Sequence, residues 1–463
     1  MPCLDLSPEM NDFIIALGLE RADIQSFSAN REDDSLIVTL TLNRKEHLCP
    51  FCMTSTSKVK DYRLKKIRHS VLNPTPCIIH YKARRYFCPI CRKAFYEHNP
   101  FSSSGSKVSI ETVYNVLNEL RNPASTFSSI AQKYHLSPSS VSNLFDKHVT
   151  ISRRTLPECL SFDEVYAFKS HDSDYICVLL DYTDKKITDI LPSRKKKYLI
   201  NYFSTIPLEE RKKVRYCSFD MWKTYRIVSK LMFPNCICIV DKFHLLQELM
   251  RRVERVRIDV MNKNYKIKNT LKQKQKLLKE NNKELEPDEI QKLKEASENY
   301  YLLKKFNFVL YSNNQKIHDP NIPKKYNSVL NRFANLYDIY DMIINMDEKL
   351  NEAINIRDRI HHFYSETTYE DAKRKLEEII VLCRSSNIVQ LQEYSKTLIE
   401  WKQEIINSFI KVPTINKKMN NALIENRNKS IKLLKHSSNG YTNWDRFRNR
   451  VLFCLNEDST FKI

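Results

Sequence analysis

Runs of apolar residues predict two groups of β-strands in this chain. Near the start, residues 35–43 alternate between apolar and polar side chains as SLIVTLTLN, the pattern of a half-buried strand. From residue 160 onward there are five short runs: LSFDEVYAF, YICVLLDYTD, KITDILP, VRYCSFD and CICIVD. The second and the last are apolar enough to lie in the centre of a sheet. Two segments of helical character, KYLINYFSTIPLEERKK and MWKTYRIVSKLMF, follow the third and fourth runs, so this region predicts a mixed α/β unit.

Helical periodicity characterises residues 107–150. The three helical segments are SIETVYNVLNEL, STFSSIAQKYHL and SPSSVSNLFDKHV. Ser137 is a typical N-cap residue, and Pro138 suits the first position of a helix. Two helices joined by a short turn fit a helix-turn-helix. The exposed start of the second helix would then present four side chains to bases or phosphates: Ser139, Ser140, Ser142 and Asn143. A generic three-helix bundle is the alternative.

Residues from about 245 to 411 are overwhelmingly helical in pattern and rich in charge. The part from 262 to 300, which is rich in Lys, Glu and Asn, predicts a pair of long helices facing water. Trp401, in LIEWKQEIINSF, is expected in the core, and stacking on a flipped base is the alternative.

The composition favours a nucleic-acid partner. The chain has 463 residues, 42% of them apolar, and a net charge of +21. This charge favours binding to a polyanion, because binding releases counterions from phosphates. Glycine occurs only at positions 18, 105 and 440, which excludes a glycine-rich phosphate loop and with it Walker-type ATPases and Rossmann dehydrogenases. No apolar run approaches the roughly 18 residues that span a bilayer, so we expect a cytoplasmic protein without a membrane partner.

Two cysteine pairs indicate a zinc site. Most of the thirteen cysteines lie singly in apolar runs, as reduced, buried thiols do. Cys49 and Cys52 form one C-x-x-C pair, and Cys88 and Cys91 form another after 35 intervening residues. Together they can place four thiolates about 2.3 Å from one zinc ion, and the basic stretch between them suits a zinc ribbon on DNA. A redox dithiol is the alternative for one such pair. Cys77 has no partner at this spacing and is expected in the core.

Two aspartates are placed where a catalytic site could form. Asp163 lies within the first of the five strands, and Asp220 ends VRYCSFD. If these strands are neighbours, the two carboxylates converge and repel each other unless a cation neutralises them. Hard oxygen ligands suit Mg²⁺ or Mn²⁺, and two such ions can support phosphodiester cleavage. Each aspartate taken singly could instead be a turn former, a helix cap or a solvent-facing residue.

Three segments share an unusual combination of motifs: SFDEVYAFKS, VRYCSFDMWKTYRIVSKLMFPNCICIVDKFHLLQ and ENRNKSIKLLKHSSNGYTNWDRFRNRVL. The second holds D-x-W-x-x-Y followed by F-P-N and D-x-F-H. In order and character these segments resemble the DDE transposases of bacterial insertion sequences of the ISL-three type. The resemblance covers nearly the whole chain. It implies an N-terminal zinc ribbon, a helix-turn-helix and a ribonuclease-H-like catalytic domain.

The resemblance also implies the residues of the site. Asp163 and Asp220 would be the catalytic aspartates and Glu425 the catalytic glutamate, and all three would hold Mg²⁺ or Mn²⁺. Asp241 and His244 match D-x-F-H and would assist near the site, with a purely structural role as the alternative. The chain departs from the family in two places, with Asn426 where glycine is usual and His436 where arginine is common.

Glu425 is expected to project from a helix that packs on the sheet. On a helix the apolar side would hold Ile424, Ile431 and Leu434. Lys429 and Lys432 would share an adjoining arc with Glu425 and face DNA. The alternative is that Glu425 only forms surface ion pairs with these lysines.

The predicted fold is therefore a multidomain α+β chain in which a large helical insertion interrupts the ribonuclease-H-like α/β domain. The expected boundaries are an N-terminal segment at 1–44, the zinc ribbon at 45–100, the helix-turn-helix at 105–152, the first part of the catalytic core at 158–244, the helical insertion at 245–411, and the C-terminal part of the core at 412–463.

The expected function is that of a DNA transposase. The protein would bind the terminal inverted repeats of its element as double-stranded DNA, cut the strand at the element end, and transfer it to target DNA. Because two ends must be joined, a homodimer or higher homo-oligomer is expected, acting at the bacterial nucleoid. One alternative is a transposase-derived DNA-binding regulator without catalytic activity. An RNA-binding or RNA-guided nuclease of the same fold is a third class.

Overall fold

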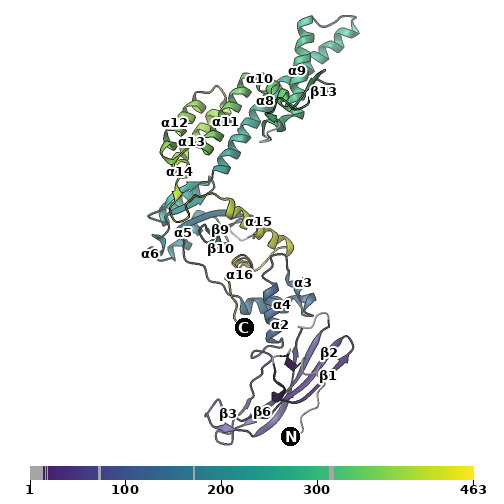
Figure 1. Cartoon of the computed structure of the whole chain (residues 1–463), viewed down its shortest axis with the longest axis vertical. Coiled ribbons are helices and arrows are strands. Elements are labelled where there is room, and N and C mark those ends of the chain that lie inside the picture. Colours follow the sequence, from purple (N-terminus) through teal and green to yellow (C-terminus); the bar gives the residue numbers. More distant parts are fainter. Residues whose placement is uncertain (1–13, 16, 18, 71–74, 170–172, 312–316) are drawn as a thin grey trace.

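The computed structural model describes residues 14, 15, 17, 19–70, 75–169, 173–311 and 317–463. These residues form an elongated molecule, with one sheet near the N-terminus, a second sheet in the middle and a helical arm at the far end (Figure 1). None of the helices within them is both long and apolar enough to cross a membrane. Part of the predicted 1–44 segment, namely 1–13, 16 and 18, lies outside the described residues.

The N-terminal sheet has the strand order β1-β2-β6-β5, and β7 pairs with β6. Strand β2 runs parallel to β6, with Leu36 opposite Cys77, so strands from both sides of residue 45 share one sheet and one core. The boundary expected between 44 and 45 therefore falls inside this sheet. Cys77 is 1% exposed, which confirms its predicted place in the core. The elements are η1 (Arg21–Asp23), β1 (Ile24–Glu32), β2 (Ser35–Leu42), β3 (His47–Leu48), β4 (Ser55–Thr56), β5 (Val59–Arg68), β6 (Cys77–Phe87) and β7 (Ala94–Tyr96).

Three short helices follow the sheet: α2 (Ile110–Glu119), α3 (Phe127–Lys133) and α4 (Pro138–His148). The predicted start of α4 is confirmed, because Ser137 Oγ accepts a hydrogen bond from the Ser140 backbone N–H and Pro138 opens the helix. The three helices share a core that also includes Phe453 of α16 (Trp444–Leu455). They are thereby joined to the C-terminal end of the chain.

The central sheet has the strand order β10-β9-β8-β11-β12. Each of the five predicted runs corresponds to one of its strands: β8 (Cys159–Val165), β9 (Ile176–Asp181), β10 (Lys186–Leu191), β11 (Tyr216–Phe219) and β12 (Ile237–Val240). The first three strands are antiparallel neighbours, whereas β11 runs parallel to both β8 and β12. The carboxyl ends of β8, β11 and β12 therefore meet at one edge.

Helices cover both faces of this sheet. On one face Phe162 packs against Phe203 of α5 (Lys196–Ser204) and Tyr225 of α7 (Lys223–Met232). The short helix α6 (Leu208–Arg211) precedes β11. The other face packs against α15 (Ala422–Ser437) and α16 through one apolar cluster. The C-terminal helices α15 and α16 thus return the chain to the sheet after a long excursion.

That excursion is the helical arm, which begins with the 39-residue helix α8 (Lys242–Glu280). Helix α8 packs along α9 (Pro287–Lys305), which confirms the predicted long helix pair. Trp401 is 3% exposed, and its ring contacts Phe219, so its core position is confirmed. The remaining elements are η2 (Asn307–Leu310), β13 (Lys325–Asn327), β14 (Arg332–Ala334), α10 (Leu336–Asn345), α11 (Glu348–Glu366), α12 (Tyr369–Ser385), α13 (Val389–Glu400), α14 (Lys402–Asn407), β15 (Lys411–Val412) and β16 (Lys417–Lys418).

Candidate active site and metal centre

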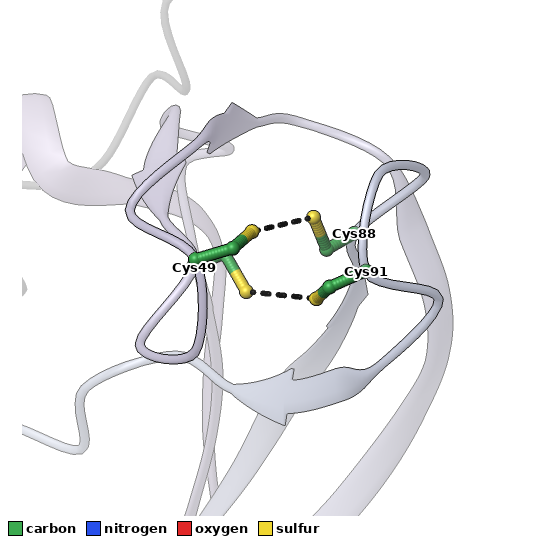
Figure 2. Close-up of side chains that lie close together, drawn as sticks. Cys49, Cys88 and Cys91 are labelled. Carbon is green, nitrogen blue, oxygen red and sulfur yellow. Dashed lines mark hydrogen bonds between the residues drawn. The ribbon is translucent and has the colours of Figure 1, made fainter.

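Four cysteines meet beside the N-terminal sheet, and we call them the sulfur centre: Cys49, Cys52, Cys88 and Cys91. The two C-x-x-C turns face each other across a small gap (Figure 2). Cys49 Sγ lies 3.6 Å from Cys91 Sγ, and Cys52 Sγ lies 3.5 Å from Cys88 Sγ. Four sulfurs at zinc-bond length would be about 3.8 Å apart on a tetrahedron. The observed spacing fits a zinc ion with little movement.

The chemistry of these thiols also fits a divalent cation. Hydrogen bonds from the side chain and the backbone of Thr54 lower the pKa of Cys52 to about 6. A backbone hydrogen bond from Lys93 lowers the pKa of Cys91, but burial and the other three sulfurs raise it to about 12. The first proton therefore leaves easily and the last one is held, because four thiolates crowd one space. A zinc ion removes this conflict by binding all four sulfurs.

Three aspartates stand in a row at the carboxyl edge of the central sheet. Ser218 of β11 is opposite Ser161 of β8, so two residues later Asp220 comes level with Asp163. Phe219 is opposite Val240 of β12, which brings Asp220 level with Asp241 one residue later. The expected convergence of the first two aspartates follows from the parallel pairing of their strands. The third aspartate continues the row.

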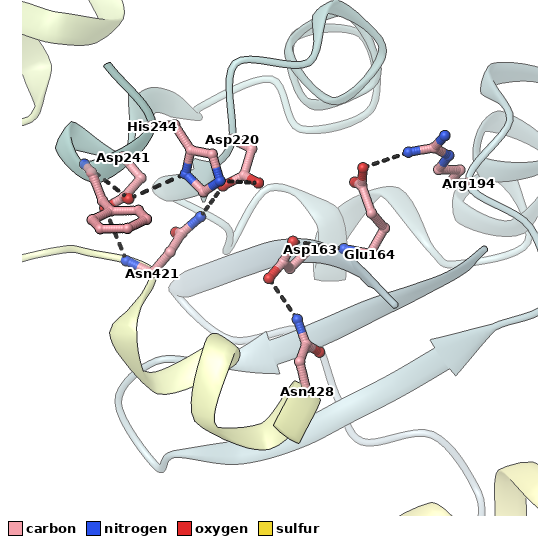
Figure 3. Close-up of polar contacts among 9 residues, drawn as sticks. Asp163, Glu164, Arg194, Asp220, Asp241, His244, Asn421 and Asn428 are labelled. Carbon is pink, nitrogen blue, oxygen red and sulfur yellow. Dashed lines mark hydrogen bonds and ion pairs between the residues drawn. The ribbon is translucent and has the colours of Figure 1, made fainter. Parts of the chain in front are cut away.

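His244 lies between two of these aspartates (Figure 3). Its Nε2 atom is 3.0 Å from Asp220 Oδ2, and its Nδ1 atom is 3.4 Å from Asp241 Oδ2. Asp241 is 4% exposed and caps α8, since its Oδ2 atom accepts a hydrogen bond from the Phe243 backbone N–H. The D-x-F-H motif is thus both a helix start and part of the site.

Helix α15 supplies the remaining residues from one face. Asn421, Glu425 and Asn428 are spaced by four and three residues, so on a helix they fall within about 60° of one another. Asn421 Nδ2 donates to Asp220 Oδ1 (2.8 Å), and its backbone N–H donates to Asp241 Oδ1 (3.2 Å). Asn428 Nδ2 donates to Asp163 Oδ2 (2.6 Å). Ligand atoms of Glu425, Asp241 and His244 all lie within 4.8 Å of one another.

We call this group the acid cluster: Asp163, Asp220, Asp241, His244 and Glu425. Of the predicted trio, Glu425 lies beside Asp241 and His244, while Asp163 stands on the other side of Asp220. The apolar side predicted for the helix is confirmed, because Ile424, Ile431 and Leu434 are all buried. Lys429 and Lys432 are exposed on the same helix.

Burial and mutual repulsion dominate the electrostatics of the acid cluster. Burial, and then the charge of Asp220, raise the pKa of Asp163 to about 8. Burial and the charge of Asp241 likewise raise the pKa of Glu425. Burial lowers the pKa of His244, but hydrogen bonds to Asp220 and Asp241 raise it to about 10. Without a cation, a histidinium and shared protons must offset the carboxylates.

The donor set fits a hard divalent cation. Carboxylate oxygens at the end of a sheet, with one imidazole, are ligands that Mg²⁺ and Mn²⁺ accept. The Oδ1 atoms of Asn421 and Asn428 are buried and have no hydrogen-bond partner among the described residues. Buried polar atoms of this kind are normally satisfied, so two further hard oxygens are available at the cluster.

Sequence reasoning missed both asparagines, although the N-x-x-x-E-x-x-N spacing around Glu425 would have placed them on its face. It also missed the ion pair between Glu164 and Arg194 beside the cluster (Figure 3). The guanidinium of Arg194 lies over the rings of Tyr175 and Trp222, 4.2 and 4.6 Å from their centroids. Such a stacked arginine holds Glu164 away from the aspartates.

The residues predicted to read DNA lie at the start of α4. Ser139 and Asn143 are exposed, and Ser140 is half-buried because its hydroxyl contacts Ser137 Oγ at 2.8 Å. The hydroxyl of Ser142, also half-buried, donates to the Ser139 carbonyl. Ser139 Oγ also lies 3.0 Å from Ser137 Oγ, so all three serines have local partners, and the side chain of Asn143 is exposed to solvent.

Comparison with protein families gives two matches. A DDE-type family of the ISL3 (ISL-three) group, described as Transposase, matches residues 160–451. A second family, described as the zinc-finger of transposase IS204/IS1001/IS1096/IS1165, matches residues 45–91. The first match contains the whole acid cluster and more than half of the chain, and the second contains all four cysteines of the sulfur centre. A search of curated proteins found no match.

Proposed function

The chain belongs to the ISL3-type transposases, and from this membership we propose that it cuts DNA at the ends of its element and transfers the strand to target DNA. The observation that carries the proposal is the convergence of Asp163, Asp220, Asp241 and Glu425 at one sheet edge. Buried carboxylates that repel one another are unfavourable for the fold. Their concentration at one place is best explained by a catalytic role.

We further propose that the central sheet is a ribonuclease-H-like core and that α8 to α14 form an insertion within it. The strand order β10-β9-β8-β11-β12, with three antiparallel strands followed by two parallel ones, supports this assignment. The expected divisions at 105–152, 158–244, 245–411 and 412–463 accompany it. Among them, 245 falls inside α8, so core and insertion share one continuous helix.

At the proposed active site, Asp163, Asp220 and Glu425 would hold magnesium, with Asp241 and His244 beside them. The bound ions would supply the positive charge that activates the attacking oxygen and stabilises the leaving one. Asn428 orients Asp163, and Asn421 orients both Asp220 and Asp241 through the hydrogen bonds described above. His244 holds Asp220 and Asp241 apart at fixed spacing.

DNA would reach this site from two directions. Lys429 and Lys432, exposed one and two turns after Glu425, would hold backbone phosphates near the acid cluster. The helices α3 and α4 would act as a helix-turn-helix, with Ser139, Ser140 and Asn143 at the bases of the terminal repeat. Because two element ends must be joined, a homodimer or higher homo-oligomer is the expected working form.

The substitution Glu425→Gln tests the proposal. It keeps the size of the side chain and removes its charge, so folding and end binding should persist while magnesium-dependent cleavage falls at least a thousandfold. The substrate is a duplex carrying the terminal repeat, which sequencing of the DNA flanking the gene would supply. Cleavage and strand transfer are followed on gels with labelled ends.

Asp445→Asn is the matched control, because Asp445 is an exposed acid in the first turn of α16, as Glu425 is in the first turn of α15. It should cut at the wild-type rate. A Glu425→Gln protein that cut equally fast would reduce Glu425 to a surface ion-pair residue. A wild-type protein that bound ends but never cut them would favour the regulator instead.

A further inference from the structure

One face of helix α8 carries a line of basic residues that starts at the active site. Counting 100° per residue, His244, Arg251, Arg255, Lys266 and Lys276 fall within about 80° of one another. The opposite side of the helix is apolar, with Leu245, Leu249, Val253, Val256 and Val260 buried. The basic residues therefore lie on the face of α8 opposite its buried side, and α8 runs from the central sheet along the arm (Figure 1). We call Arg251, Arg255, Lys266 and Lys276 the α8 track.

The α8 track is exposed, and its charges are not neutralised within the described chain. All four side chains are exposed, and no described carboxylate lies within ion-pair distance of any of them. Two acids near the start of the same helix have other partners. Glu248 pairs with Arg252, and Glu254 with Arg257.

The first part of the α8 track lines the active-site cleft. A cleft of about 360 Å³ is bordered by Asp220, Trp222, His244, Arg251 and Arg255, among others. The same cleft is thus bordered by two residues of the acid cluster, Asp220 and His244, and by the beginning of the α8 track. A polyanion whose reacting bond lies at Asp220 would meet Arg251 and Arg255 next.

We propose that the α8 track binds the backbone phosphates of the DNA duplex that leaves the active site, and guides it along the helical arm. This inference rests on the proposed function. With a rise of 1.5 Å per residue, Lys266 and Lys276 lie about 33 and 48 Å along the helix from His244. On B-DNA these distances correspond to about 10 and 14 base pairs. The arm would therefore contact DNA well beyond the nucleotides that react.

Lysines on the neighbouring face separate this inference from an ordinary solvated helix. Lys272 and Lys279 are also exposed, but they are centred about 90° away from the α8 track. They carry the same charge on the same part of the helix, so Lys272→Ala with Lys279→Ala is a matched control for Lys266→Ala with Lys276→Ala. Simple loss of net charge would affect both double variants equally.

The test compares short and long duplexes. The end-bearing duplexes extend past the cleavage site by either about 6 or about 20 base pairs. The extension lies on the flanking side in one series and on the element side in the other. A duplex of about 40 base pairs without an element end serves as target DNA. Binding is measured over a range of salt concentrations without added magnesium, and cleavage of the short duplex is measured with it. Full-length protein is used throughout.

For Lys266→Ala with Lys276→Ala, we measure the slope of the logarithm of the binding constant against the logarithm of the salt concentration. On one of the long duplexes we expect the magnitude of this slope to fall by about two, since each lost phosphate contact removes about 0.9. The duplex that loses affinity identifies which DNA follows the arm. Binding and cleavage of the short duplex, and all properties of the control variant, should stay at wild-type level.

The proposed role of the α8 track would be refuted if Lys266→Ala with Lys276→Ala left binding to every long duplex unchanged, or if the control variant lost as much affinity. Either result would leave the proposed function intact. A wild-type protein that neither bound nor cut element ends would overturn both.

Discussion

The sulfur centre and the acid cluster are built in opposite ways. The four cysteines come from two tight turns, one between β3 and β4 and the other between β6 and β7, so each turn places two ligands by local geometry. The acid cluster draws on the ends of three strands and on a helix that follows after the arm, with Asp163 and Asn428 in contact across 265 residues of sequence. One centre is local, and the other depends on the whole central fold.

The sulfur centre and the acid cluster also affect the stability of the fold in opposite ways. The sulfur centre joins strands that have few other contacts, such as the two-residue pair β3 and β4, so its zinc contributes to folding. The acid cluster sits on a sheet that is already packed on both faces. There the carboxylates oppose folding, and the proposed catalytic role would explain why they are retained. Removing ligands should therefore destabilise the first region and stabilise the second.

The largest effect is expected from Asp163→Asn. The variant should lose cleavage by at least a thousandfold. It should also gain about 1–3 kcal/mol in stability of the central sheet at pH 7, because it removes a buried carboxyl group that must take up a proton on folding, its pKa being raised to about 8. Asn428 can turn its amide and offer its unpaired Oδ1 atom to the new side chain. Thermal unfolding without added magnesium and end cleavage with magnesium measure the two effects.

Asp181→Asn, at the half-buried end of β9, is the control and should leave cleavage unchanged. A destabilised Asp163→Asn protein would contradict the claim that this carboxylate opposes folding.

The raised pKa of Asp163 also predicts that the stability of the central sheet depends on pH. Since the folded pKa lies above the unfolded value of about 4, the folded state binds the extra proton, and the wild-type sheet loses stability as pH rises from about 4 to 8.

The difference between the two centres explains what the sequence could predict. The C-x-x-C spacing identified all four cysteines, because turn geometry alone brings each pair together. The five strands followed from apolar runs. Asp163 and Asp220 were singled out by their places in two of these strands, and Asp241 by the D-x-F-H motif that it shares with the family. The contacts of Asn421 and Asn428 could not be predicted, because they depend on how α15 packs against the central sheet after the helical arm of α8 to α14.

The second prediction concerns the sulfur centre. Replacing Cys49 and Cys88 with Ser should abolish binding of about one zinc per chain and unfold the region of β3, β4 and β7, because Ser is a poor zinc ligand at neutral pH. Specific end binding should fall, whereas the unfolding transition of the central sheet should stay in place. Metal analysis and limited proteolysis check this.

Cys77→Ser is the matched control, since Cys77 is a buried thiol of the same sheet outside the centre. It should keep its zinc. A double variant that retained stoichiometric zinc would refute the assignment of the four ligands.

The N-terminal sheet shows where local patterns fail. The strand at 35–43 was predicted, but its parallel pairing with β6 was not, because strand pairing across some 40 residues leaves no mark in the spacing of either strand. The expected boundary at 45 was drawn where the cysteine motif begins. Physically, the ribbon is continuous with the preceding strands through the shared core of Val38, Leu40, Ile79 and Tyr81.

The smallest predicted effect separates the two regions by pH. His69 is buried at the end of β5, and burial lowers its pKa to about 4. The Nδ1 atom of His69 lies 3.0 Å from Ser109 Oγ. Ser109 donates its own hydroxyl proton to Thr112 Oγ1, so Nδ1–H of His69 is the donor to Ser109. The low pKa keeps the ring neutral.

The low pKa of His69 makes the stability of this region depend on pH. The unfolded chain binds a proton at this histidine near pH 6.5, whereas the folded chain does not until about pH 4, so stability is lost as pH falls between these values. The loss is at most about 3 kcal/mol, and Glu111, with a carboxylate oxygen 3.9 Å from the ring, reduces it.

His69→Asn keeps a donor near the position of Nδ1 and removes the titration. Between pH 6.5 and 4 the wild-type N-terminal region should lose more stability than the variant. The central sheet should gain stability over the same range, because folding takes up a proton at Asp163, whose folded pKa is raised to about 8. Protonation of the cysteines destabilises both proteins equally, so the difference between them isolates His69. Unfolding monitored separately in the two regions, by hydrogen exchange at several pH values, measures these opposite slopes. Equal pH dependence of the variant and the wild type would show that His69 is not held neutral by burial.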